Sequence, residues 1–251
     1  MRLSVTPLQL LLQSYHLYRE QGAFYLGYAA WMLLPISALL TLSLLPITNE
    51  GTVFILALFL SVFEGLLTLY ITIFLFLATD KRLGHTEASH SELLLRARTL
   101  IKPVILVAVL QCLVVLGGFL LLIVPGIIFL IWFAFAQIAV ILDHQRGFDA
   151  LSFSREIVSG RFWSVLWFLV SGPLFILLGH AFLSSLIFGT IALIMHTDPT
   201  VWVNGNLPMW VEAIDAITQT FLFPFLLIYF VLVYRLFTRE HPPVLKKIQT
   251  A

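Results

Sequence analysis

Long apolar runs constrain the fold of this chain more than any other feature. Six of them are predicted to cross a lipid bilayer, at about residues 23–45, 52–78, 103–121, 125–142, 162–187 and 213–237. A helix crosses about 30 Å of hydrocarbon with about 20 apolar residues, which matches the length of these runs. Only 11% of the residues are charged, against about 25% in a soluble domain. We therefore predict that residues 1–251 form a single polytopic domain, an all-α integral membrane protein with six transmembrane helices.

The fifth apolar run extends beyond its crossing, to residue 195. A straight helix over residues 162–195 would be about 51 Å long at 1.5 Å per residue, which exceeds the thickness of the hydrocarbon core. We expect Gly172 and Pro173 to kink this segment, and its outer end to lie along the membrane surface. Pro224 is expected to interrupt the last crossing.

The placement of positive charge predicts the orientation of the chain. All 14 Lys and Arg residues fall in the N-terminal segment, in the second or fourth connection, or at the C-terminal end, which includes a polar tail at residues 238–251. With six crossings all of them lie on one side, as the positive-inside rule requires. Two crossings within residues 162–195 would place the basic tail outside, so we reject seven. Both termini are therefore predicted to be cytoplasmic.

An amphipathic helix is predicted at residues 6–20, before the first crossing. Thr6 is the expected N-cap, Pro7 the first helical residue, and Gln9 the partner of Thr6 in a capping box. Apolar and aromatic residues then recur on one face of the helix, at Leu8, Leu11, Leu12, Tyr15 and Tyr18. We expect this helix to lie in the plane of the inner membrane surface.

Two more amphipathic helices are predicted, each before a later pair of crossings. One starts with a second capping-box pattern at Ser89 and Glu92, and the other is about ten residues long with Asp149 as its N-cap. A Gly, aromatic and Pro pattern recurs at residues 22–35 and 160–173. It suggests three parallel units, each a surface helix followed by a hairpin of two crossings. Chance recurrence is the alternative, because these residues are common in membrane helices.

Residues 123–166 carry a pattern that resembles the signature region of a broad bacterial membrane family. That family includes the YciC-like inner-membrane proteins of unknown function and the membrane domain of some glycerophosphodiester phosphodiesterases. The matching residues are Pro125, Gly126, Asp143, Gly147, Ala150, Ser154, Gly160, Phe162 and Trp163. The resemblance implies a multi-pass protein of the bacterial inner (plasma) membrane. The phosphodiesterase activity of the fused members belongs to a separate soluble barrel, for which this chain has no room, so it is not carried over.

Glu64 is the leading candidate for a functional residue inside the membrane. It lies midway along the second crossing, where an ionisable group is costly. Ser61 and Thr68 extend a polar stripe on the same helix face, and His180 is an ionisable residue of the fifth crossing. These residues predict a proton or cation pathway. The alternative is that Glu64 and His180 are hydrogen-bonded packing residues, as we expect for Gln111 and Gln137.

Basic residues of the surface helices are candidate contacts for lipid headgroups. Each contributes about 1 kcal/mol of attraction near the anionic inner leaflet. They are Arg96, Arg98, Lys102, Arg155 and Arg161. The alternative is that they only satisfy the positive-inside rule.

The remaining polar residues give little sign of chemistry. His196, Asp198, Glu212 and Asp215 gather on the outer side, where an ordinary solvated loop is the alternative to a metal site. The sequence contains no nucleophile with a base, no phosphate-binding loop and no zinc spacing. We predict a non-enzymatic membrane protein that acts through lipids or partner proteins, without cofactor, metal or nucleic acid. The alternative is a transporter or channel that uses the intramembrane carboxylate.

Overall fold

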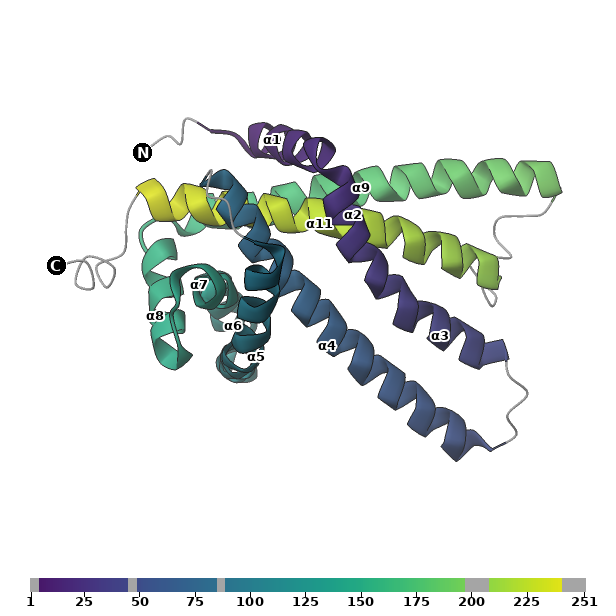
Figure 1. Ribbon diagram of the computed structural model, residues 1–251. Coiled ribbons are helices and arrows are strands. Elements are labelled where there is room, and N and C mark those ends of the chain that lie inside the picture. The colour runs from purple at the N-terminus through teal and green to yellow at the C-terminus, as the bar shows by residue number, and fades with distance from the viewer. Residues whose placement is uncertain (1–4, 45–48, 85–88, 197–207, 241–251) are drawn as a thin grey trace. The chain divides into compact units, whose positions relative to one another are not determined.

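The computed structural model describes residues 5–44, 49–84, 89–196 and 208–240, and within these ranges it is helical without strands. The helices are shown in Figure 1. They are α1 (Pro7–Glu20), α2 (Gly22–Ala29), the 3-10 helix η1 (Ala30–Met32), α3 (Leu33–Leu44), α4 (Glu50–Leu83), α5 (His90–Leu121), α6 (Ile123–Trp132), α7 (Ala136–Asp143), α8 (Gly147–Val158), α9 (Phe162–Met195) and α11 (Met209–Glu240).

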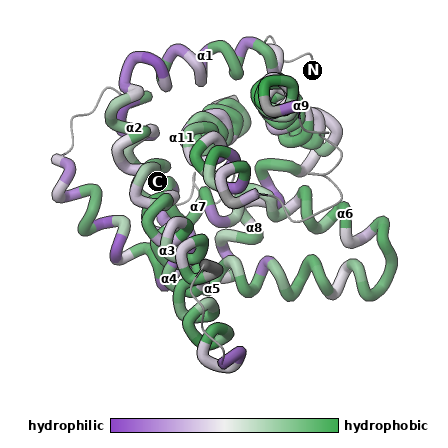
Figure 2. The backbone as a smooth tube through the Cα atoms, turned by 90° about the vertical axis from the view of Figure 1, so that its right-hand side faces the viewer, coloured by the Kyte–Doolittle hydropathy of each residue, from purple (hydrophilic) through white to green (hydrophobic). Residues whose placement is uncertain are grey.

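Six helical segments are long and apolar enough to cross a membrane, as predicted. They are Gly22–Leu42, Glu50–Leu83, His90–Leu121, Ile123–Asp143, Phe162–Ile194 and Trp210–Thr238. Figure 2 shows apolar residues along most of the length of the long helices. The predicted polar tail is described only to residue 240, and its remainder lies outside the described residues.

The chain divides into two compact units. Unit 1 comprises Met1–Leu17, Tyr70–Gly172 and Leu227–Ala251, and unit 2 comprises Tyr18–Leu69 and Pro173–Leu226. Helices α5 to α8 belong entirely to unit 1, where they pack against one another (Figure 1). The two cavities that hold the candidate sites each lie within a single unit.

The predicted start of α1 is confirmed. The backbone N–H of Thr6 donates to Gln9 Oε1 at 2.8 Å, and the N–H of Gln9 donates to Thr6 Oγ1 at 3.3 Å. This capping box satisfies two of the free N–H groups at the helix end. Leu10, Leu11 and Ser14 are buried in α1, whereas Leu8, Leu12 and Tyr15 of the predicted apolar face are exposed.

Proline interrupts these helices less than the sequence predicts. The expected second surface helix and third crossing form one helix, α5, which runs through Pro103. Helix α11 likewise continues through Pro224, so the predicted interruption there is wrong. A proline removes one backbone hydrogen bond, and neighbouring helices compensate for that loss in membrane proteins.

The fourth crossing and the helix after it also differ from prediction. The crossing begins at Ile123, and Pro125 lies in its first turn, where a backbone N–H is not needed. Helix α8 begins at Gly147, with Arg146 at the N-cap position, so the prediction of Asp149 as N-cap is wrong. Asp149 instead lies in the first turn, where its charge stabilises the helix dipole.

Candidate functional site

A break in the fourth crossing explains why a polar helix lies between two apolar segments. Helix α6 ends at Trp132 and α7 begins at Ala136. The hydroxyl of Ser154 in α8 donates to the Trp132 carbonyl at 2.8 Å and accepts from the Phe135 N–H at 3.1 Å. Unsatisfied backbone groups are costly in an apolar environment. Helix α8 therefore supplies the two hydrogen bonds that the break removes.

The buried face of α8 holds that hydroxyl in place. Ala150, Phe153, Ser154 and Ile157 are fully buried, and they recur three or four residues apart. The next residue of α8, Arg155, places its guanidinium 4.6 Å from the centre of the Trp132 ring, which is a cation–π distance. The amphipathic pattern of α8 thus packs it onto α6 and α7 (Figure 1).

A charged cluster within unit 1 joins residues of three helices, and the sequence did not predict it. Arg235 of α11 donates from Nε to Asp80 Oδ1 of α4 at 2.5 Å, and its Nη1 lies 3.8 Å from Asp143 Oδ2 of α7. The Tyr234 hydroxyl donates to the same Asp143 oxygen. Tyr234 is fully buried, and the Asp143 side chain is only 7% exposed. Charge-assisted hydrogen bonds of this kind are strong and fix the positions of the helices that carry them.

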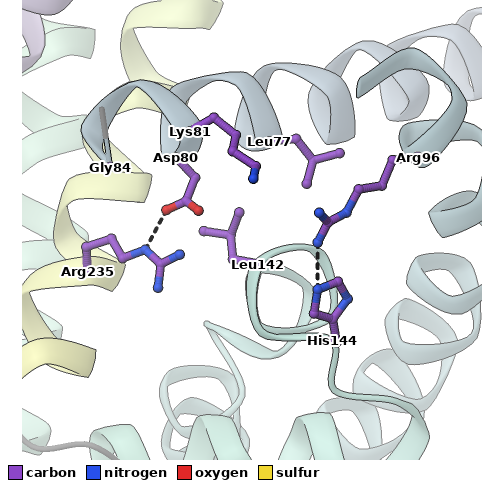
Figure 3. A pocket seen from close by; sticks show the side chains of 8 residues that line it. All are labelled: Leu77, Asp80, Lys81, Gly84, Arg96, Leu142, His144 and Arg235. Atoms are coloured by element: carbon purple, nitrogen blue, oxygen red, sulfur yellow. Dashed lines mark hydrogen bonds and ion pairs between the residues drawn. The ribbon is translucent and has the colours of Figure 1, made fainter. Parts of the chain in front are cut away.

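A cavity of about 330 Å³ lies beside this cluster. Figure 3 shows the residues that line it, which are Leu77, Asp80, Lys81, Gly84, Arg96, Leu142, His144 and Arg235. The Asp80–Arg235 pair lies on one side and Arg96 with His144 on the other, and Lys81 points into the space between them. Arg96 Nη2 lies 2.6 Å from His144 Nε2.

The surroundings of His144 favour its neutral form. Burial lowers the pKa of the imidazole below its ordinary value of 6.5, and the positive charges of Arg96 and Arg146 lower it further. The Asp143 carboxylate partly opposes this shift. A neutral imidazole has one acceptor nitrogen. We therefore assign Arg96 as the donor and Nε2 of His144 as the acceptor.

Unit 2 contains a second, larger cavity of about 1320 Å³, and it brings together two predicted site residues. Glu64 of α4 and His180 of α9 both line it, among mainly apolar side chains. Its other polar lining residues are Ser184, Ser185, Glu212, Asp215, Gln219 and Thr220. Among the described residues, the lining of this cavity does not include Ser61 or Thr68, and Ser61 is exposed.

His180 takes part in a polar network on the wall of this cavity. Its Nε2 lies 3.6 Å from Asp215 Oδ1 and 3.4 Å from Ser184 Oγ. Gln219 donates to the other Asp215 oxygen at 2.6 Å. These are the residue types of a serine hydrolase triad, but both oxygens face the same ring nitrogen. A triad requires them at opposite nitrogens, so these contacts do not have the geometry of a triad.

The other outer-side residues give no metal centre in the described part of the chain. Glu212 and Asp215 line the cavity, whereas Asp198 lies outside the described residues. Among the residues described, no group of three or more His, Cys, Asp or Glu side chains is arranged to hold a metal ion. Two other predicted packing residues do meet, because Gln137 donates to Gln111 at 3.2 Å.

The five basic candidates have different surroundings in the structure. Arg96 lines the small cavity, while Arg98 and Lys102 are exposed on α5. Arg155 stacks on the ring of Trp132. Arg161 donates to the backbone carbonyls of Ile157 and Phe237, at 2.9 and 3.3 Å.

Several residues of the signature region have structural roles. Gly147 and Gly160 adopt positive φ angles of 52° and 77°, which favour glycine. A Cβ on Gly126 would lie 2.5 Å from the Phe119 ring, so the two helices approach closely there. The rings of Phe162 and Trp163 make an edge contact with centres 5.5 Å apart, and Trp163 is 78% exposed. Pro125 lies in the first turn of α6.

No protein-family model, curated protein or solved structure matches this chain. The resemblance of residues 123–166 to the YciC-like proteins therefore rests on the sequence pattern alone.

Proposed function

We propose that this chain is a non-enzymatic, multi-pass protein of the bacterial inner membrane that binds an amphipathic, lipid-like molecule in the cavity of unit 2. The cavity itself is the observation that carries the proposal. It combines mainly apolar walls with a few polar groups, as ligand sites do. Its volume of about 1320 Å³ is large enough for a molecule of lipid size.

The charges on the cavity wall indicate which headgroup would fit. Glu64, Glu212 and Asp215 are carboxylates, and His180 is the one basic side chain of the described lining. An amine or hydroxyl group on the ligand would donate hydrogen bonds to these oxygens. The apolar part of the molecule would contact the side chains of α9 and α11. The ligand class is therefore an amphiphile with a hydrogen-bond donor at its polar end.

The cellular location is also part of the proposal. The restriction of all 14 Lys and Arg residues to the N-terminal segment, alternate connections and the C-terminal end supports cytoplasmic termini. The resemblance to the YciC-like family supports a bacterial inner membrane. The structural roles of Ser154 and Asp143 agree with that resemblance, since both belong to the shared pattern. A solved YciC-like structure with the same serine-bridged break would test the family membership.

Native mass spectrometry of the protein, released from discs of its own membrane, tests the ligand. Glu64→Gln keeps the size of the side chain but removes its charge, and Ser61→Ala on the exposed side of α4 is the matched control. We expect a discrete bound species on the wild type and the control. Loss of one charged hydrogen bond should reduce its occupancy in Glu64→Gln by about tenfold. The same mixture of loosely bound lipids on all three proteins would refute the proposal.

A second candidate function is transport of protons or cations. It is favoured because Glu64 and the His180–Asp215 pair line one cavity, and ionisable side chains inside a membrane often mark proton or ion pathways. Reconstituted vesicles with an internal pH dye would report a flux that Glu64→Gln abolishes and Ser61→Ala retains. Flux equal to that of protein-free vesicles would exclude this candidate.

A further inference from the structure

The small cavity of unit 1 has an excess of positive charge. The described lining includes three cations, Lys81, Arg96 and Arg235, and one carboxylate, that of Asp80. Arg235 is neutralised by its ion pairs with Asp80 and Asp143. Among the described residues, neither Lys81 nor Arg96 has a carboxylate oxygen within 4.0 Å. Within the described part of the chain, two positive charges at this site therefore have no counter-ion.

The two cations are arranged to bind the same ligand. Figure 3 shows the Lys81 ammonium and the Arg96 guanidinium directed into one space, from α4 and α5 respectively. The bond to His144 uses one of the five N–H donors of Arg96, so others are left for a ligand. The Asp80–Arg235 and Arg96–His144 contacts hold the two walls of the cavity in place. The site is thus formed before any ligand binds.

We propose that this cavity binds a phosphate group, with Arg96 as a forked donor and Lys81 as a point charge. Arginine matches the geometry of phosphate oxygens, and lysine adds a compact, strongly charged partner. A volume of about 330 Å³ admits a phosphate-bearing headgroup or a small phosphate ester. Because Lys81 and Arg96 belong to a basic connection, the positive-inside rule places the site at the cytoplasmic headgroup level, where anionic lipids gather.

The test compares two charge-matched double variants of the full chain in phosphatidylcholine discs. Lys81→Gln with Arg96→Gln removes the cavity cations. Arg98→Gln with Lys102→Gln removes two exposed cations from α5. One arm titrates inorganic phosphate, and the other adds phosphatidylglycerol to the discs. Thermal unfolding and native mass spectrometry measure binding, and Lys81→Gln alone serves if the cavity double variant does not fold.

We expect the wild type and the α5 variant to bind one of the two probes with similar affinity. The cavity variant should bind at least about tenfold more weakly, because each charge-assisted contact accounts for about that factor. Stabilisation by inorganic phosphate would identify a soluble phosphate compound as the ligand. Retention of phosphatidylglycerol alone would identify a lipid headgroup. The proposal is overturned if the wild type binds neither probe, or if the α5 variant loses as much affinity as the cavity variant.

Discussion

Replacing Ser154 by alanine should destabilise unit 1 strongly, although it removes only one oxygen atom. In an unbroken helix the Trp132 carbonyl would accept from the N–H of Ala136, but that N–H donates to Phe133 instead. The Ser154 hydroxyl takes its place and also accepts from Phe135. The substitution therefore leaves the Trp132 carbonyl and the Phe135 N–H without their hydrogen-bond partner.

The magnitude follows from the cost of a buried polar group without a hydrogen bond, about 1–3 kcal/mol. Two such groups give about 2–6 kcal/mol. Alanine recovers roughly 0.5 kcal/mol of this through its higher helix propensity. We expect a net loss of about 1.5–5.5 kcal/mol in the free energy of unfolding of Ser154→Ala, whereas Ser152→Ala on the exposed face of α8 should be neutral or slightly stabilising.

Titration with SDS in mixed micelles, followed by tryptophan fluorescence, measures the free energy of unfolding of both variants under one condition. Ser154→Thr retains a hydroxyl and should recover part of the stability. If Ser154→Ala unfolds at the same SDS fraction as Ser152→Ala, the hydroxyl does not stabilise the break, and the short polar helix does not have the bridging role that we infer.

Two further predictions concern packing and pH. Gly172→Ala should destabilise by about 1–3 kcal/mol, because its methyl carbon would lie 2.0 Å from the fully buried Tyr229 side chain; Gly179→Ala, with open space around it, is the control in the same SDS titration. The lowered pKa of His144 means that the unfolded chain binds more protons between that pKa and about 6.5. The free energy of unfolding should therefore fall as the pH drops below about 6.5. Asparagine tolerates the left-handed backbone at position 144 and has no side chain that is protonated beside Arg96. The fall should therefore be smaller in His144→Asn.

The six crossings were predictable because length and hydropathy are properties of a single segment. Local side-chain chemistry was also readable, as the capping box of Thr6 and Gln9 illustrates. Proline was misjudged at two positions, Pro103 and Pro224, because helix-breaking tendencies describe an isolated helix. In membrane proteins, neighbouring helices and polar side chains commonly compensate for the single bond that a proline removes.

The break at residues 133–135 left no local signal, because the sequence Phe-Ala-Phe contains neither glycine nor proline. Its stability depends on a serine about twenty positions away. The Asp80–Arg235 pair joins residues 155 positions apart, and a single sequence does not show which helices meet. The available signal was positional: Asp80 is a carboxylate at the end of the apolar second crossing, directly before Lys81.

The two units use polar groups inside apolar helices in different ways. In unit 1, Ser154 and Tyr234 donate to defined acceptors, so these groups hold the fold together. Glu64 in unit 2 has no hydrogen bond or ion pair to another described residue, yet it lines a large cavity. The packing hypothesis for Glu64 requires a partner on a neighbouring helix. An intramembrane carboxylate that faces a cavity instead supports a ligand or a proton as its partner, and the comparison of Glu64→Gln with Ser61→Ala decides between these two roles.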